Sequence, residues 1–509
     1  MAVFSKIGAI ALALTLAGFA RCDEDLPAVE GITSNILNNR DQVLSVPLTR
    51  VHQSLFPETF SRLKGRYFQA GVRDIIGAAY LADITVGTGD PSQKIQVLLD
   101  TGSYELWVNP NCTKSSVPDL CETFGKYDPT LSLTAQNLNA TTQIRYGSGT
   151  VNISYFTDEI SISSGSIQTQ QFGVATDSER IWFGIMGLGY GRRQLGQTKG
   201  SLKYNSVIDN IYDQRYTNSR LFGLELGPQG KPQIAVTGQI IFGGVDTNKY
   251  AGNLSKIPLE AIDNHYRITL SSISHRTPDN VTSTITETPV IVIMDSGTTL
   301  SILPRDVVET IASKFPGAIY GNDGTYTVPC TLQDQPGSLD FKFGSNTVIR
   351  VPYSEFVWGA GSYEGSDMCL LGVQWNTAAS PDPTAKTYLI LGDTFMRAAY
   401  TVFDQDNTAL YIANYTTCGT QSAIVAVPAG VDAAARIPGN CGPPTASPSV
   451  TMATTGTSVT PISTGFFSSG DPNPPYEFIR GADYDDYFFK HSERGHDKFI
   501  DQQGYDFID

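Results

Sequence analysis

The stretch VLLDTGS (residues 97–103) recurs in altered form as VIMDSGT (residues 292–298). In both copies an apolar run typical of a buried strand ends in Asp, which is followed by a hydroxyl residue, Gly and a second hydroxyl residue. Two apolar residues and a Gly then follow each copy, as IMG at 185–187 and as ILG at 390–392. These four matching signals in one order indicate that a whole lobe is repeated within the chain.

A single Asp-Thr-Gly triplet would be explained as an ordinary turn after a strand. Two copies in repeated lobes have a chemical explanation, because a pseudo-twofold axis would bring Asp100 and Asp295 together. Carboxylates about 3 Å apart share one proton, and the resulting pKa values belong to the pair. One carboxylate then accepts a proton from water while the protonated one polarises a carbonyl. The hydroxyls of Thr101, Ser103, Ser296 and Thr298 are expected to donate to the carboxylates, and Gly102 and Gly297 complete the set of expected orienting residues.

Composition excludes several classes of protein. The 509 residues include 35 basic and 50 acidic ones, for a net charge of −15, which disfavours binding to nucleic acid or an anionic membrane. Short runs rich in Val, Ile, Thr, Tyr and Phe, broken by Gly, Pro, Asn and Asp, predict an all-β protein. The clearest expected strands are 93–99, 151–162, 239–243, 290–294, 388–391 and 399–403, and the clearest expected helix is 304–312.

The N-terminal region predicts export and later processing. Residues 1–20 carry Lys6 before an apolar run of 13, which is typical of a signal peptide and too short to span a bilayer. Residues 21–76 are acidic early and basic late, and precede a strongly acidic remainder, which favours a pro-segment held by charge complementarity. The alternative is a short N-terminal helix of the mature domain. As a pro-segment it would inhibit the enzyme intramolecularly, with Lys64 or Arg66 pairing with the two Asp residues.

The cysteines fit an oxidising compartment. Loss of Cys22 with the leader region leaves six, an even number suited to three disulfides: Cys112–Cys121, Cys330–Cys369 and, by default, Cys418–Cys441. No metal site is expected. Asn-x-Ser/Thr sequons predict glycosylation at Asn111, Asn139, Asn152, Asn253, Asn280 and Asn414. Residues 417–470 are interpreted as a Cys-containing and then Ser/Thr/Pro-rich linker, and 471–509 as a disordered acidic, aromatic tail, with a docking or inhibitory role as its alternative.

Residues from about 77 to 416 resemble the pepsin family of aspartic endopeptidases, in its secreted fungal branch with the yapsins and candidapepsins. Besides the two Asp motifs, the resemblance rests on Trp107 within ELWV and on Tyr146, Gly147, Ser148 and Gly149, which match the flap motif. It implies an all-β, bilobal fold with the active-site cleft between a first lobe (about 77–240) and a second (about 241–416). It also implies a flap hairpin over the dyad, with Tyr146 hydrogen-bonding toward Trp107.

The expected activity is hydrolysis of protein or peptide substrates at acidic pH by a monomeric, cofactor-free enzyme without a covalent intermediate. The expected location is extracellular, with retention at the cell wall or in an acidic vacuole-like compartment left open. Tyr104 and Glu105 replace the small polar pair commoner in the family, and Glu105 is expected to face solvent rather than influence substrate preference. Two alternatives stay open: a non-catalytic binding protein on the same fold, and a wall-associated protein dominated by its C-terminal region.

Overall fold

The computed structural model describes residues 42–52, 78–89, 92–109, 112, 118–147, 149–179, 181, 183–191, 204–229, 235–260, 265–321, 324–359, 367–376, 388–419 and 421–442. The predicted signal peptide, Lys64, Arg66, Asn111, Ser148 and the chain beyond 442 lie outside these residues. Within the described ranges, no helix is both long enough and apolar enough to cross a membrane.

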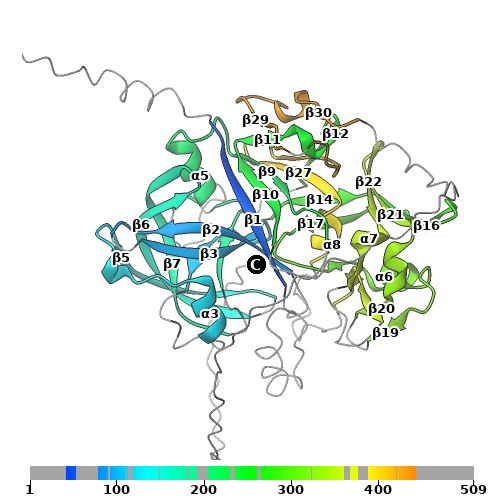
Figure 1. Cartoon of the computed structure of the whole chain (residues 1–509), viewed down its shortest axis with the longest axis horizontal. Helices are drawn as coiled ribbons and strands as arrows, with labels where there is room; N and C mark the ends of the chain where they lie inside the picture. Colours follow the sequence, from blue (N-terminus) through cyan, green and yellow to red (C-terminus); the bar gives the residue numbers. More distant parts are fainter. Residues whose placement is uncertain are drawn as a thin grey trace, which may run out of the picture.

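Two β-rich lobes lie side by side and share one large sheet (Figure 1). The first lobe is built mainly from the long strands β5, β6 and β7, and the second from three smaller sheets. The all-β, bilobal prediction is therefore confirmed. In the order in which they pair, the thirteen strands of the shared sheet are β13 (Ser255–Pro258), β28 (Ala409–Asn414), β27 (Ala399–Asp404), β9 (Leu221–Glu225), β10 (Ala235–Phe242), β1 (Leu44–His52), β2 (Ala78–Val86), β3 (Gln93–Asp100), β8 (Gly184–Gly187), β4 (Leu106–Val108), β7 (Gly165–Glu179), β6 (Thr150–Ile162) and β5 (Gln136–Arg145).

The second lobe adds one five-stranded and two four-stranded sheets. The five-stranded sheet has the order β14 (Arg267–Leu270), β17 (Val290–Met294), β26 (Ile390–Leu391), β18 (Ser301–Ile302) and β25 (Val373–Gln374). The four-stranded sheets are β16 (Thr282–Thr286), β15 (Ser272–Arg276), β21 (Ser338–Phe343) and β22 (Thr347–Pro352), and β19 (Ile319–Tyr320), β20 (Tyr326–Pro329), β24 (Met368–Leu371) and β23 (Val357–Trp358).

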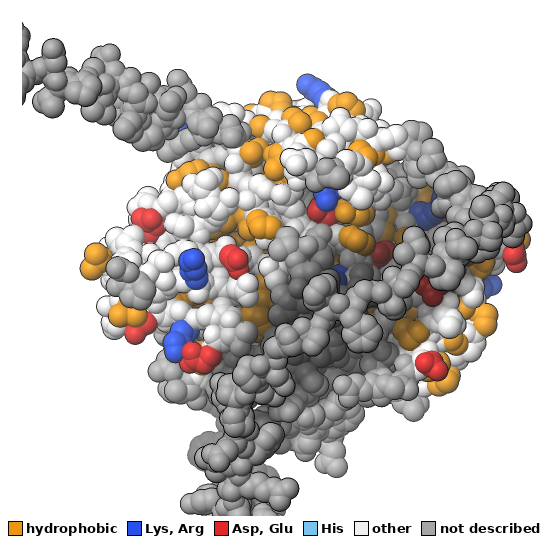
Figure 2. Space-filling view, in the orientation of Figure 1, with side chains coloured by type: hydrophobic (Ala, Val, Ile, Leu, Met, Phe, Trp, Pro, Cys, Tyr) orange, Lys and Arg blue, Asp and Glu red, His pale blue; other side chains and the backbone are white. Residues whose placement is uncertain are grey.

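Helices are short among the described residues. The predicted helix at 304–312 is α6 (Arg305–Ala312), whose apolar side chains, including Val308 and Ile311, face the core as the spacing requires. The other α-helices are α3 (Pro118–Phe124), α5 (Val207–Asp213), α7 (Tyr353–Phe356) and α8 (Asp393–Met396). Single 3₁₀ turns are η3 (Pro129–Leu131), η4 (Thr247–Lys249), η5 (Cys330–Asp334) and η7 (Ala434–Arg436). On the face shown in Figure 2, charged side chains are scattered among polar and apolar ones, some singly and some beside a side chain of opposite charge.

Strand β1 comes from the region predicted to be a pro-segment, yet it lies within the shared sheet between the lobes (Figure 1). It pairs antiparallel with β10 on one side and with β2 on the other. The side chains of Leu44, Val46 and Leu48 are buried in the main core. Arg50, also buried, donates to the carbonyl oxygen of Pro228 at 2.8 Å. Part of the predicted pro-segment thus completes the sheet that joins the two lobes.

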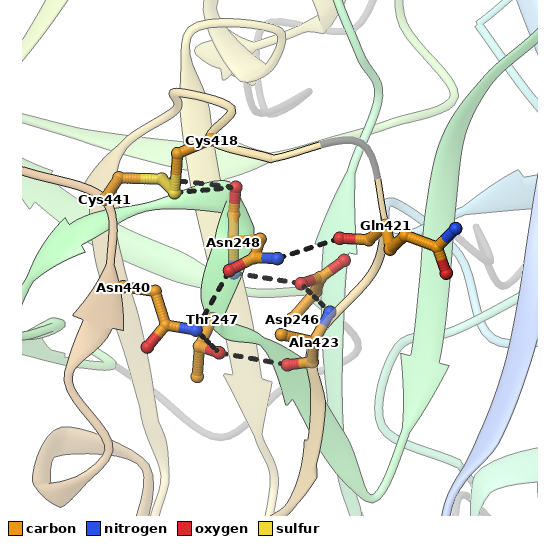
Figure 3. The surroundings of a disulfide bond; sticks show 8 residues. All are labelled: Asp246, Thr247, Asn248, Cys418, Gln421, Ala423, Asn440 and Cys441. Carbon is orange, nitrogen blue, oxygen red and sulfur yellow. Dashed lines mark hydrogen bonds between the residues drawn. A yellow bond between two sulfur atoms is a disulfide. The ribbon is translucent and has the colours of Figure 1, made fainter.

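The folded chain continues past residue 416, where the sequence predicted a linker to begin. Residues 421–442, here the C-terminal clasp, add β29 (Ile424–Ala426) to β11 (Gly244–Asp246) and β30 (Gly439–Asn440) to β12 (Ala251–Gly252). Figure 3 shows the polar contacts: the Asp246 carboxylate accepts from the Ala423 amide, and the Asn440 amide donates to Thr247 and Asn248. The linker prediction is therefore wrong up to residue 442, because these contacts bind the segment to the second lobe.

Replacing both Cys418 and Cys441 with Ser is expected to lower the free energy of unfolding by about 3 kcal/mol. These cysteines form a disulfide across a sequence separation of 23 residues. Without it the unfolded chain gains conformational entropy, because the loop between the two residues is no longer closed. The measurement is the urea midpoint of the double variant against the parent chain. Cys112→Ser/Cys121→Ser, whose disulfide closes a separation of only nine residues, is the comparison and should cost less. An unchanged midpoint for the 418/441 variant would show that the clasp holds without its disulfide.

Candidate active site

The two Asp loops begin in the same way in both lobes. Strand β3 ends at Asp100 and lies parallel to β8, which contains the downstream IMG motif, with Asp100 opposite Gly187. Strand β17 ends just before Asp295 and lies parallel to β26, which contains the downstream ILG motif. The amide of Asp295 donates to the carbonyl oxygen of Leu391 at 3.1 Å. The repeat read from the sequence is thus a repeat of structure, and it places both carboxylates at the interface of the lobes.

Each carboxylate is held by the same pair of donors from its own loop. One oxygen accepts a backbone amide, at 2.8 Å from Gly102 to Asp100 and at 2.8 Å from Gly297 to Asp295. The other oxygen accepts a hydroxyl, from Ser103 to Asp100 and from Thr298 to Asp295. Both Asp side chains are nearly buried, at 6% and 8% exposed. One donor on each oxygen fixes the rotamer of each carboxylate and leaves the carboxylate facing the other lobe.

The remaining two hydroxyls do not reach the carboxylates. The Thr101 hydroxyl donates to the carbonyl oxygen of Met294 at 2.8 Å, and the Ser296 hydroxyl donates to that of Leu99 at 2.7 Å. Each hydroxyl oxygen also accepts the backbone amide of the other residue, at 3.1 and 3.0 Å. The expectation that all four hydroxyls donate to the carboxylates is therefore wrong for Thr101 and Ser296. These two residues cross-link the loops and fix the position of one lobe's Asp relative to the other.

Gly102 and Gly297 lie against the carboxylate of the opposite lobe. A Cβ built on Gly102 would lie 2.6 Å from the carboxyl carbon of Asp295. One built on Gly297 would lie 2.6 Å from an oxygen of Asp100. Neither distance is possible for a real side chain, so the close approach of the two Asp residues requires Gly at both positions.

Gly102→Ala is expected to lower kcat about a hundredfold, because displacing a reacting group by about 1 Å has an effect of that size. The added methyl forces the Asp295 carboxylate away from Asp100 while both Asp residues and their charges remain. The measurement is kcat on a peptide substrate, normalised to correctly folded protein. Gly442→Ala, where a Cβ meets nothing within 4 Å, is the control. Undiminished turnover in Gly102→Ala would mean that the observed spacing of the carboxylates is not needed.

The environment of the dyad favours a retained proton. Burial, followed by the negative charge of Asp295, raises the pKa of Asp100 well above its ordinary value. The hydrogen bonds from Ser103 and Gly102 oppose this shift without cancelling it. The pair therefore holds one proton over a pH range in which an isolated carboxyl group would have lost its own.

Asp100→Asn is expected to raise the melting temperature at pH 7 by roughly 5 °C and to leave it unchanged at pH 3. Because the pKa of Asp100 is raised on folding, the folded chain holds a proton that the unfolded chain releases. Below the ordinary pKa of about 4 both states keep the proton, and the free energy of unfolding is highest there. As pH rises from there toward the raised pKa, only the unfolded state releases the proton, so the free energy of unfolding falls. Asn carries no titrating proton and escapes the loss. Calorimetry across pH 3 to pH 7 measures the difference, and parallel curves for the two proteins would contradict it.

Asp393 is a third buried acid close to the dyad, and sequence analysis missed it. It begins α8 and its side chain is 1% exposed. Burial is the main reason its pKa is raised well above the ordinary value, and the negative charge of Asp295 adds to this. The sequence could have indicated Asp393, because this acid directly follows the ILG motif, whereas Leu188 follows the IMG motif of the first lobe. At this position, after the apolar-apolar-Gly motif, only the second lobe has an acid. Among the described residues, no group of three or more His, Cys, Asp and Glu side chains is placed to hold a metal ion.

Tyr146 lies at the tip of the hairpin formed by β5 and β6. Its amide donates to the carbonyl oxygen of Gly149 at 2.8 Å, which closes the turn. The indole nitrogen of Trp107 donates to the Tyr146 hydroxyl at 2.9 Å, the contact that the family resemblance implied. Burial and then the charge of Asp100 raise the pKa of Tyr146, so the dyad lies within electrostatic reach of its hydroxyl. The flap motif and the Asp100 loop are therefore brought together, with Ser148 outside the described residues.

Glu105 does not face solvent, contrary to the sequence expectation. Its side chain is 1% exposed, and the Tyr155 hydroxyl donates to it at 3.0 Å. The expectation failed because Tyr155 lies 50 residues downstream, on β6, and only the fold brings it to the Asp100 loop.

The predicted disulfides Cys112–Cys121, Cys330–Cys369 and Cys418–Cys441 are all present, so these pairings are confirmed. The sequon side chains differ in their environment. Those of Asn139, Asn253 and Asn280 are exposed, and Asn152 is half-buried. Asn414 is exposed, but its side-chain amide donates to Val348.

Two like β lobes that hold paired carboxylates between them, beside a tyrosine-tipped hairpin, have the architecture of an aspartic peptidase. The sequence model of the family "Eukaryotic aspartyl protease" matches residues 79–415, well over half of the chain. The chain therefore belongs to the eukaryotic aspartyl protease family, and it is a hydrolase of peptide bonds.

Fungal relatives agree with this assignment. "Secreted aspartic protease 3" of Candida albicans is 34% identical over 359 residues, which cover 68% of this chain and 82% of the relative. "Probable aspartic-type endopeptidase opsB" of Aspergillus oryzae is 30% identical over 421 residues, which cover 79% of this chain and 83% of the relative. The second alignment, unlike the family match, is long enough to include part of the sequence outside 79–415.

Proposed function

We propose that this protein is a secreted aspartic endopeptidase, made as a zymogen, which cleaves proteins at acidic pH with Asp100 and Asp295 as its catalytic pair. The observation that carries the proposal is the reciprocal arrangement of the two carboxylates. Each is held by one amide and one hydroxyl of its own loop and faces a glycine of the other. Identical supports on two nearly buried acids favour a shared proton over two independent charges.

The chemistry follows from that single proton. A water molecule between the carboxylates gives a proton to the ionised one, and its oxygen bonds to the carbonyl carbon of the scissile peptide. The protonated carboxyl group donates its proton to the carbonyl oxygen. As the tetrahedral intermediate collapses, the C–N bond breaks and the carboxyl group that took the water proton donates it to the leaving nitrogen. One hydroxyl of the intermediate gives its proton to the other carboxylate, so the pair again holds one proton. No atom of the enzyme bonds to the substrate, and Tyr146 and its hairpin close over the substrate to limit access of bulk water.

Export and zymogen formation rest on the N-terminal region. The apolar run after Lys6 supports a signal peptide, and several relatives are named as secreted proteases. The pro-segment would supply β1 to the shared sheet and place the basic cluster of residues 62–73 between β1 and β2 in sequence. Charge pairing between that cluster and the dyad would inhibit the zymogen at neutral pH, and acid would weaken it by protonating the pair.

Cleavage of a denatured protein substrate from pH 3 to pH 7, with and without a statine-type transition-state mimic, tests the activity. We expect maximal cleavage in acid and complete inhibition by the mimic. A mature, folded chain that cleaves nothing and does not bind the mimic would instead favour a non-catalytic binding protein. Fractionation of culture medium, wall and vacuole tests the location, and retention on the wall would favour a function that depends on the C-terminal region.

A further inference from the structure

The buried carboxylate of Glu105 lies on the chain segment that connects the dyad to the flap contact. It is five residues after Asp100 and two residues before Trp107. Its backbone is fixed, because the Glu105 carbonyl oxygen accepts the Gly187 amide at 2.9 Å at the end of β8. A carboxylate almost fully removed from solvent on this segment must be compensated by a specific contact. One compensating contact is the hydrogen bond from Tyr155 at 3.0 Å.

Tyr155 belongs to β6, the strand that returns from the flap tip. Across the sheet, Trp107 on β4 and Tyr155 on β6 both pair with Gly173, on the strand β7 between them. Paired residues of neighbouring strands have their side chains on the same face, so Trp107 and Tyr155 share one face. Gly173 has no side chain, and a Cβ there would meet that of Trp107 at 3.1 Å. The side chain nearest to that position is that of Ile153 on β6, at 2.5 Å, so the glycine makes room for Ile153 and Trp107 on this face.

Two hydrogen bonds thus link the Asp100 loop to the flap hairpin on this face. Trp107 reaches the flap tip through the Tyr146 hydroxyl, and Glu105 reaches the flap's return strand through the Tyr155 hydroxyl. Trp107 and Tyr155 also belong to one apolar cluster, against which Tyr146 packs. Of the two links, the one through Glu105 is buried at both ends. It meets β6 five residues after the start of that strand, so it restrains the hairpin away from its tip.

We propose that Glu105 is a positioning residue that sets the orientation of the flap over the dyad through its hydrogen bond with Tyr155. It touches neither substrate nor the reacting atoms. It fixes β6 relative to the Asp100 loop, and so determines how readily Tyr146 closes on a bound peptide. The inference rests on the proposed function, because it assigns Tyr146 to a hairpin that closes on substrate. Its consequence is that loss of the bond weakens substrate binding more than it slows the chemical step.

Tyr155→Phe tests the proposal, with Tyr127→Phe as the matched control. Tyr127 also donates from a buried hydroxyl to a buried carboxylate of β6, that of Asp158, but this bond does not join the Asp100 loop. We expect Tyr155→Phe to raise KM about tenfold, the ratio typical of losing one hydrogen bond to a charged group, with kcat within about twofold. The dissociation constant of a statine-type mimic should rise in parallel. Tyr127→Phe should lower stability and leave both constants unchanged.

Variants of Glu105 separate geometry from packing. Glu105→Gln retains an oxygen that accepts from Tyr155, so KM should stay within about threefold of the parent value. Glu105→Ala should match or exceed Tyr155→Phe, and Glu105→Ala/Tyr155→Phe should be no worse than the more impaired single variant. If Tyr155→Phe behaves like Tyr127→Phe, or if kcat falls with KM unchanged, the proposal is overturned. If the parent chain itself neither cleaves substrate nor binds the mimic, the proposed function has failed instead.

Discussion

Asp100→Asn and Asp295→Asn are each expected to reduce peptide cleavage at acidic pH by about a thousandfold or more. Asn retains an oxygen that accepts the loop amide, from Gly102 in one lobe and from Gly297 in the other, so the loop geometry survives. Asn neither accepts the proton of the attacking water nor donates one to the carbonyl oxygen. With either Asp replaced, the pair loses its shared proton and one of its two roles is vacant.

The measurement is initial rate against pH, from pH 3 to pH 7, on a peptide substrate with all proteins at equal folded concentration. Asp83→Asn, a change of the same kind on the exposed face of β2, controls for loss of one negative charge. Combining the two Asn substitutions should add little further loss, because the carboxylates act as a unit. A single Asn variant that keeps more than a tenth of the parent rate would mean that the catalytic pair has been misassigned.

The repeat made the centre of the site predictable from sequence. Each Asp follows a run of apolar residues whose identity is set by burial between two strands, so the motif and its downstream partner stay recognisable. By contrast, the roles of Thr101 and Ser296 depend on how one lobe lies against the other. A hydroxyl next to Asp reads as a donor to that Asp, and only the pseudo-twofold arrangement places the opposite loop's carbonyl closer.

The boundaries of the folded unit were harder to read, because they depend on partners far along the chain. Strand β1 looks like any short apolar run until β10, about 190 residues downstream, is placed beside it. About half of the residues in the C-terminal clasp are apolar, but six of them are alanines, and Gly and Pro interrupt them, so no helix or strand period is recognisable. Its order comes from burial of Val427 and Ala434 in an apolar cluster of the second lobe, from contacts with Asp246 and Asn248, and from the disulfide to Cys418. Of these, only the disulfide was predicted from the sequence.

Leu48→Asp is expected to prevent the chain from folding. The Leu48 side chain is fully buried at the centre of β1, and the residue pairs with Gly238 of β10. Truncating a buried Leu costs about 2–5 kcal/mol, and an unpaired buried carboxylate adds a penalty of similar size. The total approaches the roughly 5–15 kcal/mol by which a typical domain is stable. Because β1 pairs with β10 on one side and with β2 on the other, its loss would leave each of these strands without its neighbour at the junction of the lobes.

Pro47→Asp is the matched control, because the neighbouring side chain is exposed and points to the opposite face of the strand. Yield of soluble protein and its melting temperature measure the effect in both variants, before any processing. Normal yield and stability of Leu48→Asp would show that the sheet closes without β1. In that case the N-terminal region would serve only to inhibit. If Leu48→Asp fails to fold while Pro47→Asp folds normally, the pro-segment is also a structural part of the zymogen, and its removal must leave either this strand or a replacement between β10 and β2.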